Sequence, residues 1–168
     1  MSTHEVETPP DQVAQEAKVL TCSDGVVHGT REDRSGEALA ELLTEHGFTV
    51  VERRVTEDGA DPVAAALAEM TDGFAGLVVT TGGTGFAPRD QTPEGTRRVI
   101  ERDAPGIAEA MRLRNPLGRL SRGVAGVRGR SIVVNTPGST SGCVEQLGAV
   151  IDVLPHALRL LHDTDAAH

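Results

Sequence analysis

A glycine-rich segment, VVTTGGTGFAPRDQTPEGT at residues 78–96, carries the strongest chemical signal in the chain. Gly82, Gly83 and Gly85 permit positive φ angles and let the backbone approach a ligand closely. Successive N–H groups in such a turn can form an anion-binding nest. The segment has neither the Gly-Lys-Ser/Thr ending of a P-loop nor the fingerprint of a dinucleotide-binding turn. It therefore predicts a phosphate site of a different kind.

Two charged residues follow these glycines. Arg89 can pair with a phosphate, and Asp90 can hold Mg²⁺ through its carboxylate oxygens. Thr81 and Thr84 add hydroxyl donors within the glycine run. The alternative is a glycine-rich surface turn with solvated charges, but the neighbouring Arg-Asp pair favours a phosphate site.

A second turn of this type, NTPGSTSG, occupies residues 135–142, between an apolar run and a helical pattern. Pro137, Gly138 and Ser139 form its tight part, and the N-terminus of the following helix offers free N–H groups to an anion. Turns like this are common between strands and helices, so alone it is a weak signal. Two such turns after two apolar strands suggest one composite pocket.

Polar residues also follow two other predicted strands. Ser23 and Asp24 come directly after the first strand, and Asp58 follows the second. Because ligands of parallel sheets bind at the carboxyl ends of the strands, we expect all three residues near the glycine turns. Taken alone, Asp58 is more often a turn carboxylate than a metal ligand, and Asp33 is better explained as a helix cap.

The elements that position these residues follow from alternating apolar runs and helical patterns. Strands are expected at residues 18–22, 48–53, 76–80 and 131–135. Helices are expected at residues 35–46, 61 to about 70, 92 to about 102, 104 to about 112, and 144 onward. Pro155 should kink or break the last helix, and residues 115–130 resist assignment. This order predicts an α/β fold, a three-layer α/β/α sandwich with a mostly parallel sheet.

The length of 168 residues predicts one domain. We expect it to span residues 18–162, between a disordered N-terminal tail at 1–17 and a short C-terminal tail at 163–168. A net charge of -9 and the lack of Trp and Tyr argue against a nucleic-acid partner. Because the chain shows neither an apolar run of membrane-spanning length nor a signal peptide, we expect a cytoplasmic protein without a membrane partner. Its two cysteines are expected to be buried thiols.

The TGGTG sequence followed by RD and TPE resembles the signature of the MoaB/Mog family, whose fold is shared by the gephyrin G domain. The resemblance extends over about residues 18–161 and includes SDG…DRSG, VTED, LSRGVAGVRG and the PGS turn, in the expected order. It implies a protein of molybdenum-cofactor biosynthesis that binds molybdopterin, a pterin dithiolene with a terminal phosphate. Active members use Mg-ATP to join AMP to that phosphate, and release pyrophosphate. The resemblance further implies a homotrimer or a dimer of trimers, and suggests the molybdenum-insertion protein as a partner.

The resemblance also assigns roles by position. Asp58 and Asp90 match the two carboxylates that the family uses in catalysis, where they would hold Mg²⁺ against the phosphates. Residues that match family positions around the two substrates are Ser23, Asp24, Thr81, Gly82, Gly83, Thr84, Gly85, Arg89, Ser121, Pro137, Gly138 and Ser139. Among these, Ser23 and Asp24 would lie near the nucleotide. Ser121 and the Pro137–Ser139 turn would line the pterin side.

Three alternatives remain open at this point. The chain could instead be a binding paralogue of the same fold that holds molybdopterin without catalysis. It could be a nucleotide-pyrophosphate hydrolase of the CinA type, although those proteins usually carry GGLGPT followed by DD where this chain has TGGTGFAP and RD. An oligomerising α/β protein without chemistry is the alternative that the two glycine turns favour least.

Overall fold

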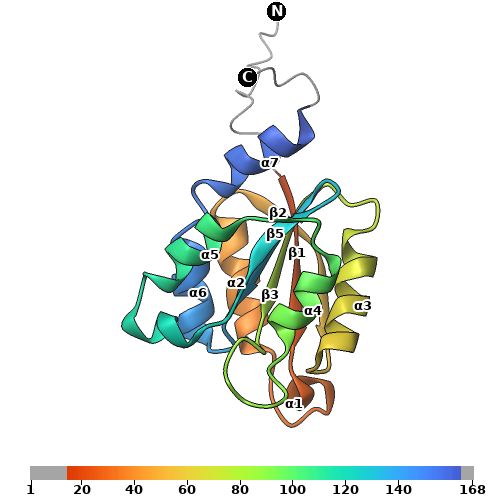
Figure 1. Cartoon of the computed structure of the whole chain (residues 1–168), viewed down its shortest axis with the longest axis vertical. Coiled ribbons are helices and arrows are strands. Elements are labelled where there is room, and N and C mark those ends of the chain that lie inside the picture. Colours follow the sequence, from red (N-terminus) through yellow and green to blue (C-terminus); the bar gives the residue numbers. More distant parts are fainter. Residues whose placement is uncertain (1–14, 164–168) are drawn as a thin grey trace, which may run out of the picture.

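The computed structural model describes residues 15–163 and shows a three-layer α/β/α sandwich (Figure 1). Its six-stranded sheet has the order β2-β1-β3-β6-β5-β4. The strands are β1 (Gln15–Cys22), β2 (Phe48–Thr56), β3 (Gly76–Thr81), β4 (Arg102–Asp103), β5 (Ala125–Arg128) and β6 (Ser131–Thr136). Strands β2, β1, β3 and β6 run parallel, while β5 and β4 pair antiparallel. The predicted α/β fold with a mostly parallel sheet is therefore confirmed.

Helices cover both faces of this sheet. They are α1 (Asp24–Val27), α2 (Arg34–Glu45), α3 (Ala60–Thr71), α4 (Thr92–Val99), α5 (Pro105–Arg112), the 3-10 helix η2 (Pro116–Leu120), α6 (Thr140–Gly148) and α7 (Leu154–His162). In Figure 1, α2, α5 and α6 lie on one side of the sheet, and α3 and α4 lie on the other. Within residues 15–163, none of the helices combines the length and the apolar character needed to cross a membrane.

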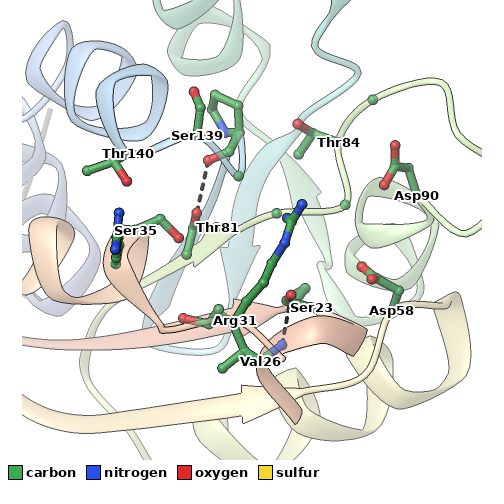
Figure 2. Close-up of a pocket in the computed structure, with 18 of the residues that line it drawn as sticks. Ser23, Val26, Arg31, Ser35, Asp58, Thr81, Thr84, Asp90, Ser139 and Thr140 are labelled. Carbon is green, nitrogen blue, oxygen red and sulfur yellow. Dashed lines mark hydrogen bonds between the residues drawn. The ribbon is translucent and has the colours of Figure 1, made fainter. Parts of the chain in front are cut away.

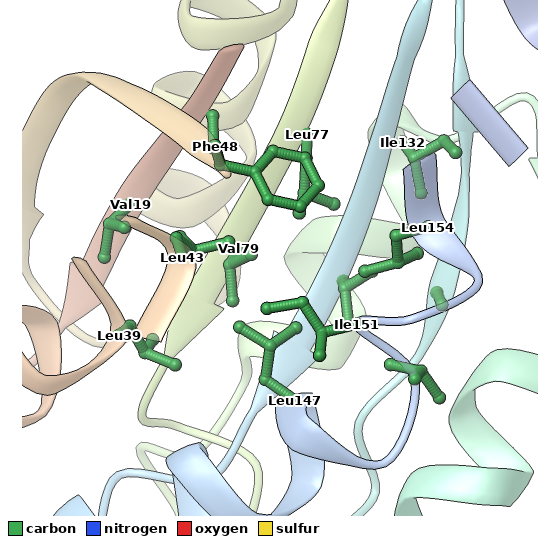
Figure 3. Packing of buried hydrophobic residues seen from close by; sticks show 14 of the residues in the cluster. Val19, Leu39, Leu43, Phe48, Leu77, Val79, Ile132, Leu147, Ile151 and Leu154 are labelled. Carbon is green, nitrogen blue, oxygen red and sulfur yellow. The ribbon is translucent and has the colours of Figure 1, made fainter. Parts of the chain in front are cut away.

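The apolar core has two parts because consecutive strand residues point to opposite faces. Val19 and Val79 pack with the α2 and α6 side, together with Leu39, Leu43 and Leu147 (Figure 3). Their neighbours Leu20 and Val78 pack with the α3 side, together with Val63, Leu67 and Met70. Every residue of β3 and of β6 is buried, which explains why the centres of these strands are apolar without alternation in the sequence. Both cysteines are buried free thiols, as expected.

The site-bearing edge of the sheet follows from the strand order. The chain leaves β1 towards β2 on one side, and returns to β3 on the other side of β1. A reversal of this kind opens a crevice at the carboxyl ends of the two central strands. The loops that follow β1, β2, β3 and β6 all begin at this edge, and Figure 1 shows α1 and the loop before α4 together there.

Several boundaries differ from the sequence-based expectation. Strand β1 begins at Gln15, so residues 15–17, which were expected in the tail, pair with β2 and belong to the sheet. The rest of both expected tails, residues 1–14 and 164–168, lies outside the described residues. Helix α4 ends at Val99, and the chain then turns into β4, which pairs with β5 inside the segment that resisted assignment. The last helix is broken as expected, and α7 carries Pro155 in its first turn.

Candidate active site

A pocket of about 950 Å³ opens at the carboxyl edge of the parallel strands. It is lined by every residue that the sequence singled out except Asp24 and Arg89. These lining residues are Ser23, Asp58, Thr81, Gly82, Gly83, Thr84, Gly85, Asp90, Ser121, Pro137, Gly138 and Ser139. The prediction that several strand-end loops form one composite pocket is therefore confirmed.

The glycine turn after β3 is packed too tightly for any side chain. Gly82 has a φ of +97°, and a Cβ there would lie 2.3 Å from the carbonyl oxygen of Cys22. Gly83 has a φ of +70°, and its Cβ would lie 2.2 Å from Oγ1 of Thr92. Both positions combine a left-handed backbone with a close neighbour, so only glycine fits. The main chain itself forms this wall of the pocket.

The two glycine turns are joined to each other. The hydroxyl of Thr81 donates to the carbonyl oxygen of Pro137 at 2.9 Å, a contact drawn in Figure 2. A Cβ on Gly138 would lie 3.2 Å from Cα of Gly82. Thr81 thus uses its hydroxyl to connect the loops rather than to contact a ligand. Ser139 caps α6 by accepting from the backbone N–H of Gly142 at 3.1 Å.

Asp58 and Asp90 stand on the same side of the pocket, next to the glycine turn (Figure 2). A Cβ on Gly83 would lie 3.4 Å from Oδ1 of Asp58, and a Cβ on Gly85 would lie 2.9 Å from Oδ2 of Asp90. Asp90 is oriented by the N–H of Ala87, which donates to its Oδ2 at 3.1 Å. The two carboxylates therefore approach the backbone of the glycine turn from the loop after β2 and from the loop before α4.

The environment of Asp58 disfavours the ionised form of its carboxyl group. Burial raises the pKa of this carboxyl above its ordinary value, and the negative charges of Asp24 and Asp90 raise it further. Two contributions oppose this trend: the N–H of Asp24 donates to Oδ2 of Asp58 at 3.1 Å, and the positive charge of Arg89 lowers the pKa to a smaller extent. A carboxylate with a raised pKa at a pocket wall is suited to binding a cation, which would relieve the repulsion.

Arg89, in the loop before α4, connects the loop after β1 with the loop after β2. Its Nε and Nη2 donate to the carboxylate of Asp24 at 2.7 and 3.0 Å, and Nη2 also donates to the carbonyl of Asp58 at 2.9 Å. This bidentate contact lowers the pKa of Asp24. The sequence suggested a phosphate contact for Arg89, but the structure directs its guanidinium to protein acceptors instead. Asp24 in turn accepts from the N–H of Asp58 at 3.1 Å, so both residues support the pocket from outside its lining.

Arg122 is a site residue that sequence reasoning missed. Its Nε donates to the carbonyl of Gly85 at 2.9 Å, its Nη2 donates to the carbonyl of Asp90 at 2.6 Å, and Nη1 contacts Glu94. Its own N–H donates to the carbonyl of Thr84 at 2.9 Å. Arg122 therefore holds both ends of the loop that carries Asp90. The only signal for it in the sequence was its place in the LSRGVAGVRG segment, which assigned it no individual role.

The pocket also includes residues for which the sequence indicated no part in binding. They are Thr21, Cys22, Val26, Thr30, Arg31, Glu32, Arg34, Ser35, Leu117, Leu120 and Thr140. Leu117 and Leu120 bring apolar surface beside Ser121, whereas the α1 side contributes charged and hydroxyl groups. The pocket thus has an apolar part at η2 and a polar part at α1.

The chain resembles known proteins over most of its length. Residues 18–156 match the model of a family described as a probable molybdopterin binding domain. A molybdopterin adenylyltransferase of Helicobacter pylori J99 is 39% identical over 150 residues, which cover 85% of this chain and 85% of the relative. The molybdopterin adenylyltransferase of Escherichia coli K12 is 36% identical over 141 residues, which cover 80% of this chain and 72% of the relative.

Solved structures agree with this result. The structure of the molybdopterin biosynthesis enzyme MoaB of Thermus thermophilus superposes with a TM-score of 0.82 at 43% identity, covering 88% of this chain and 96% of that chain. A CinA protein of Thermoplasma acidophilum, at 21% identity and a TM-score of 0.68, shares the fold alone. The chain therefore belongs to the family of molybdopterin-binding domains that includes the MoaB and Mog proteins.

Proposed function

We propose that this protein is a molybdopterin adenylyltransferase of molybdenum-cofactor biosynthesis. It would join AMP from ATP to the terminal phosphate of molybdopterin and release pyrophosphate. One observation carries the proposal: Asp58 and Asp90 flank a turn of bare backbone at the wall of a pocket of about 950 Å³. The relatives named molybdopterin adenylyltransferase, at 36% and 39% identity, support it.

The donor set of the pocket fits Mg²⁺ brought in with a nucleotide. Asp58 and Asp90 supply hard carboxylate oxygens, and the described residues hold no cluster of three or more His, Cys, Asp or Glu able to bind a metal alone. This pattern is typical of Mg²⁺, which uses one or two carboxylates and completes its shell with phosphate oxygens and water. When bound, Mg²⁺ would neutralise phosphate charge and stabilise the departing pyrophosphate.

The residues of the chain then need to position the reactants rather than to activate a nucleophile. The attacking molybdopterin phosphate is already anionic, so no general base is required. The N–H of Gly82 already donates to the carbonyl of Thr136, but the N–H groups of residues 83–85 and of the α6 N-terminus can donate to phosphate oxygens. Leu117 and Leu120 offer an apolar surface for the pterin ring. Positioning plus charge stabilisation accounts for most of the catalysis in reactions of this class.

The proposal is tested by mixing the purified protein with molybdopterin, Mg²⁺ and ATP, and quantifying adenylylated pterin and pyrophosphate. We expect both products in equal amounts. Asp90→Asn should lower the rate by about 100-fold or more, because it removes charge stabilisation at the reacting phosphates. Asp152→Asn is the matched control, since Asp152 is exposed and lies outside the pocket. Molybdopterin binding without product would favour the non-catalytic paralogue, and no binding would refute the proposal.

Arg122 is expected to act as a positioning residue for Asp90. Arg122→Ala removes the donors to the carbonyls of Gly85 and Asp90. The loop between them can then move, and the Asp90 carboxylate is no longer held in position. We expect kcat for adenylyl transfer to fall by about 10- to 100-fold, because a displacement of about 1 Å can cost that much. The KM for molybdopterin should change little, and Arg122→Lys should restore part of the rate. A variant that loses only stability, with kcat unchanged, would contradict this role.

We further propose a homotrimer or a dimer of trimers that works in the cytoplasm, where ATP is supplied, and passes its product to a molybdenum-insertion protein. Leu113 and Phe86 are 79% and 72% exposed in the single chain, so burying either residue between subunits would stabilise an assembly. The molar mass measured by light scattering tests the assembly, and a monomer would refute it.

A further inference from the structure

The pocket lining contains charged side chains besides the two carboxylates of the proposed catalysis. The lining residues include the acids Glu32, Asp58 and Asp90, and the bases Arg31 and Arg34. Arg34 is already paired, because its Nε lies 3.3 Å from Glu32. Arg89, the cation suggested by the sequence, is engaged by Asp24 outside the lining. Among residues 15–163, Arg31 is thus the lining cation whose side chain makes no hydrogen bond or ion pair.

The backbone of Arg31 is fixed by hydrogen bonds, although its guanidinium has no protein partner within the described part of the chain. The N–H groups of Thr30 and Arg31 both donate to the carbonyl of Gly25, at 2.9 and 3.1 Å, and the Thr30 hydroxyl donates to the same oxygen at 3.1 Å. Residues 25–31 therefore form a closed loop on α1. Figure 2 shows the Arg31 side chain fully extended from this loop into the pocket, rather than folded back on the surface.

Gly25 leaves the space through which this side chain passes. A Cβ at position 25 would lie 3.0 Å from Cδ and 3.2 Å from Cγ of Arg31, closer than most such contacts. The absence of a side chain at Gly25 lets the aliphatic part of Arg31 lie over α1 and directs the guanidinium beyond it. Because the extended side chain makes no hydrogen bond or ion pair with the described residues of the protein, its guanidinium donors stay available to a ligand in the pocket.

We propose that Arg31 binds a phosphate group of a substrate in this pocket. The inference rests on the proposed function, because that function brings two anions into the pocket: the triphosphate of ATP and the terminal phosphate of molybdopterin. Asp58 and Asp90 add negative charge to the pocket lining, so the positive charge of Arg31 in the same lining offsets their repulsion of the substrate phosphates. The guanidinium can contact two phosphate oxygens in parallel and brings a full positive charge, which backbone N–H groups lack.

The test is isothermal titration calorimetry of wild type and variants with Mg-ATP and, separately, with molybdopterin. We expect Arg31→Ala to raise the Kd for one of the two ligands by about 10- to 100-fold, as for loss of a charged hydrogen bond. The ligand that weakens identifies which phosphate Arg31 holds. Arg31→Lys should retain part of the affinity. Arg130→Ala is the control for loss of one positive charge, because Arg130 is exposed between β5 and β6, away from the pocket.

A second variant tests the path over Gly25. Gly25→Ala keeps the charge but crowds Cδ of Arg31, so we expect it to raise the same Kd by about 3-fold. Combined with Arg31→Ala, it should have no further effect, since the crowded side chain is gone.

Unchanged Kd values for both ligands in Arg31→Ala would overturn the inference and leave the proposed function standing. A wild-type protein that binds neither ligand would overturn the proposed function, and the inference with it.

Discussion

Asp58→Asn is expected to lower the rate of adenylyl transfer by about 100-fold or more, and to make the folded protein more stable at neutral pH. The first effect follows from the loss of a carboxylate beside the glycine turn, which removes a ligand for Mg²⁺. The second follows from the burial that raises the pKa of Asp58, because a raised pKa means that the ionised form is disfavoured in the folded state. The backbone contact from Asp24 can survive, since Asn keeps an acceptor oxygen.

The gain in stability has a defined pH dependence. The unfolded chain loses this proton near the ordinary value of 3.8, whereas the folded protein holds it to a higher pH. The Asp58 carboxyl therefore lowers the free energy of unfolding as the pH rises from 3.8 through its folded-state pKa, and the cost is complete above that pKa. The variant lacks this cost. Its advantage should be full above the folded-state pKa of Asp58, shrink as the pH falls towards 3.8, and vanish below it.

Denaturant unfolding of both proteins without ligand, over a series of pH values, measures this difference. Asp61→Asn is the matched control, because its side chain is 89% exposed and it lies outside the pocket. We expect that control to keep its activity and to lose at most about 1 kcal/mol, the usual contribution of a surface ion pair. An Asp58→Asn variant less stable than the wild type at neutral pH would show that Asp58 supports the fold instead of the site.

Gly82→Ala is expected to destabilise the protein by about 2–4 kcal/mol and to abolish pterin and nucleotide binding. A Cβ at this position would lie 2.3 Å from a backbone carbonyl oxygen, and the φ of +97° is unfavourable for any L side chain. Relief would require the end of β1 or the glycine turn to move. Because both form the pocket wall, binding is lost together with stability.

The same substitution at Gly148 provides the control. Gly148 is the last residue of α6, is exposed, and has open space where a Cβ would be. Alanine favours helix over glycine by about 1 kcal/mol, so Gly148→Ala should be neutral or stabilising. Thermal unfolding and calorimetric titration of the two variants compare them directly. A Gly82→Ala protein with wild-type stability and binding would mean that the turn is not packed as described.

The class of fold and the edge on which the site lies could be predicted from local sequence patterns. The runs at 76–80 and 131–135 have continuous apolar centres, LVV and IVV, because both faces of these strands are buried, and that pattern is local. Parallel strands end at one edge, so Asp58, the glycine turn and the PGS turn had to meet there. The glycines of the turn were informative because they also act locally: glycine readily adopts the positive φ angles found at Gly82 and Gly83.

The partners of the charged side chains, in contrast, depend on how the loops pack. Arg89 is paired with Asp24, a residue 65 positions away, and Arg122 holds carbonyls more than 30 positions away. The raised pKa of Asp58 depends on burial and on two carboxylates from other loops. The antiparallel β4 and β5 were missed because two- and four-residue strands carry too little periodicity to detect. Long charged side chains select partners through space by charge and hydrogen bonding, so their roles follow from the packed loops and not from local sequence patterns.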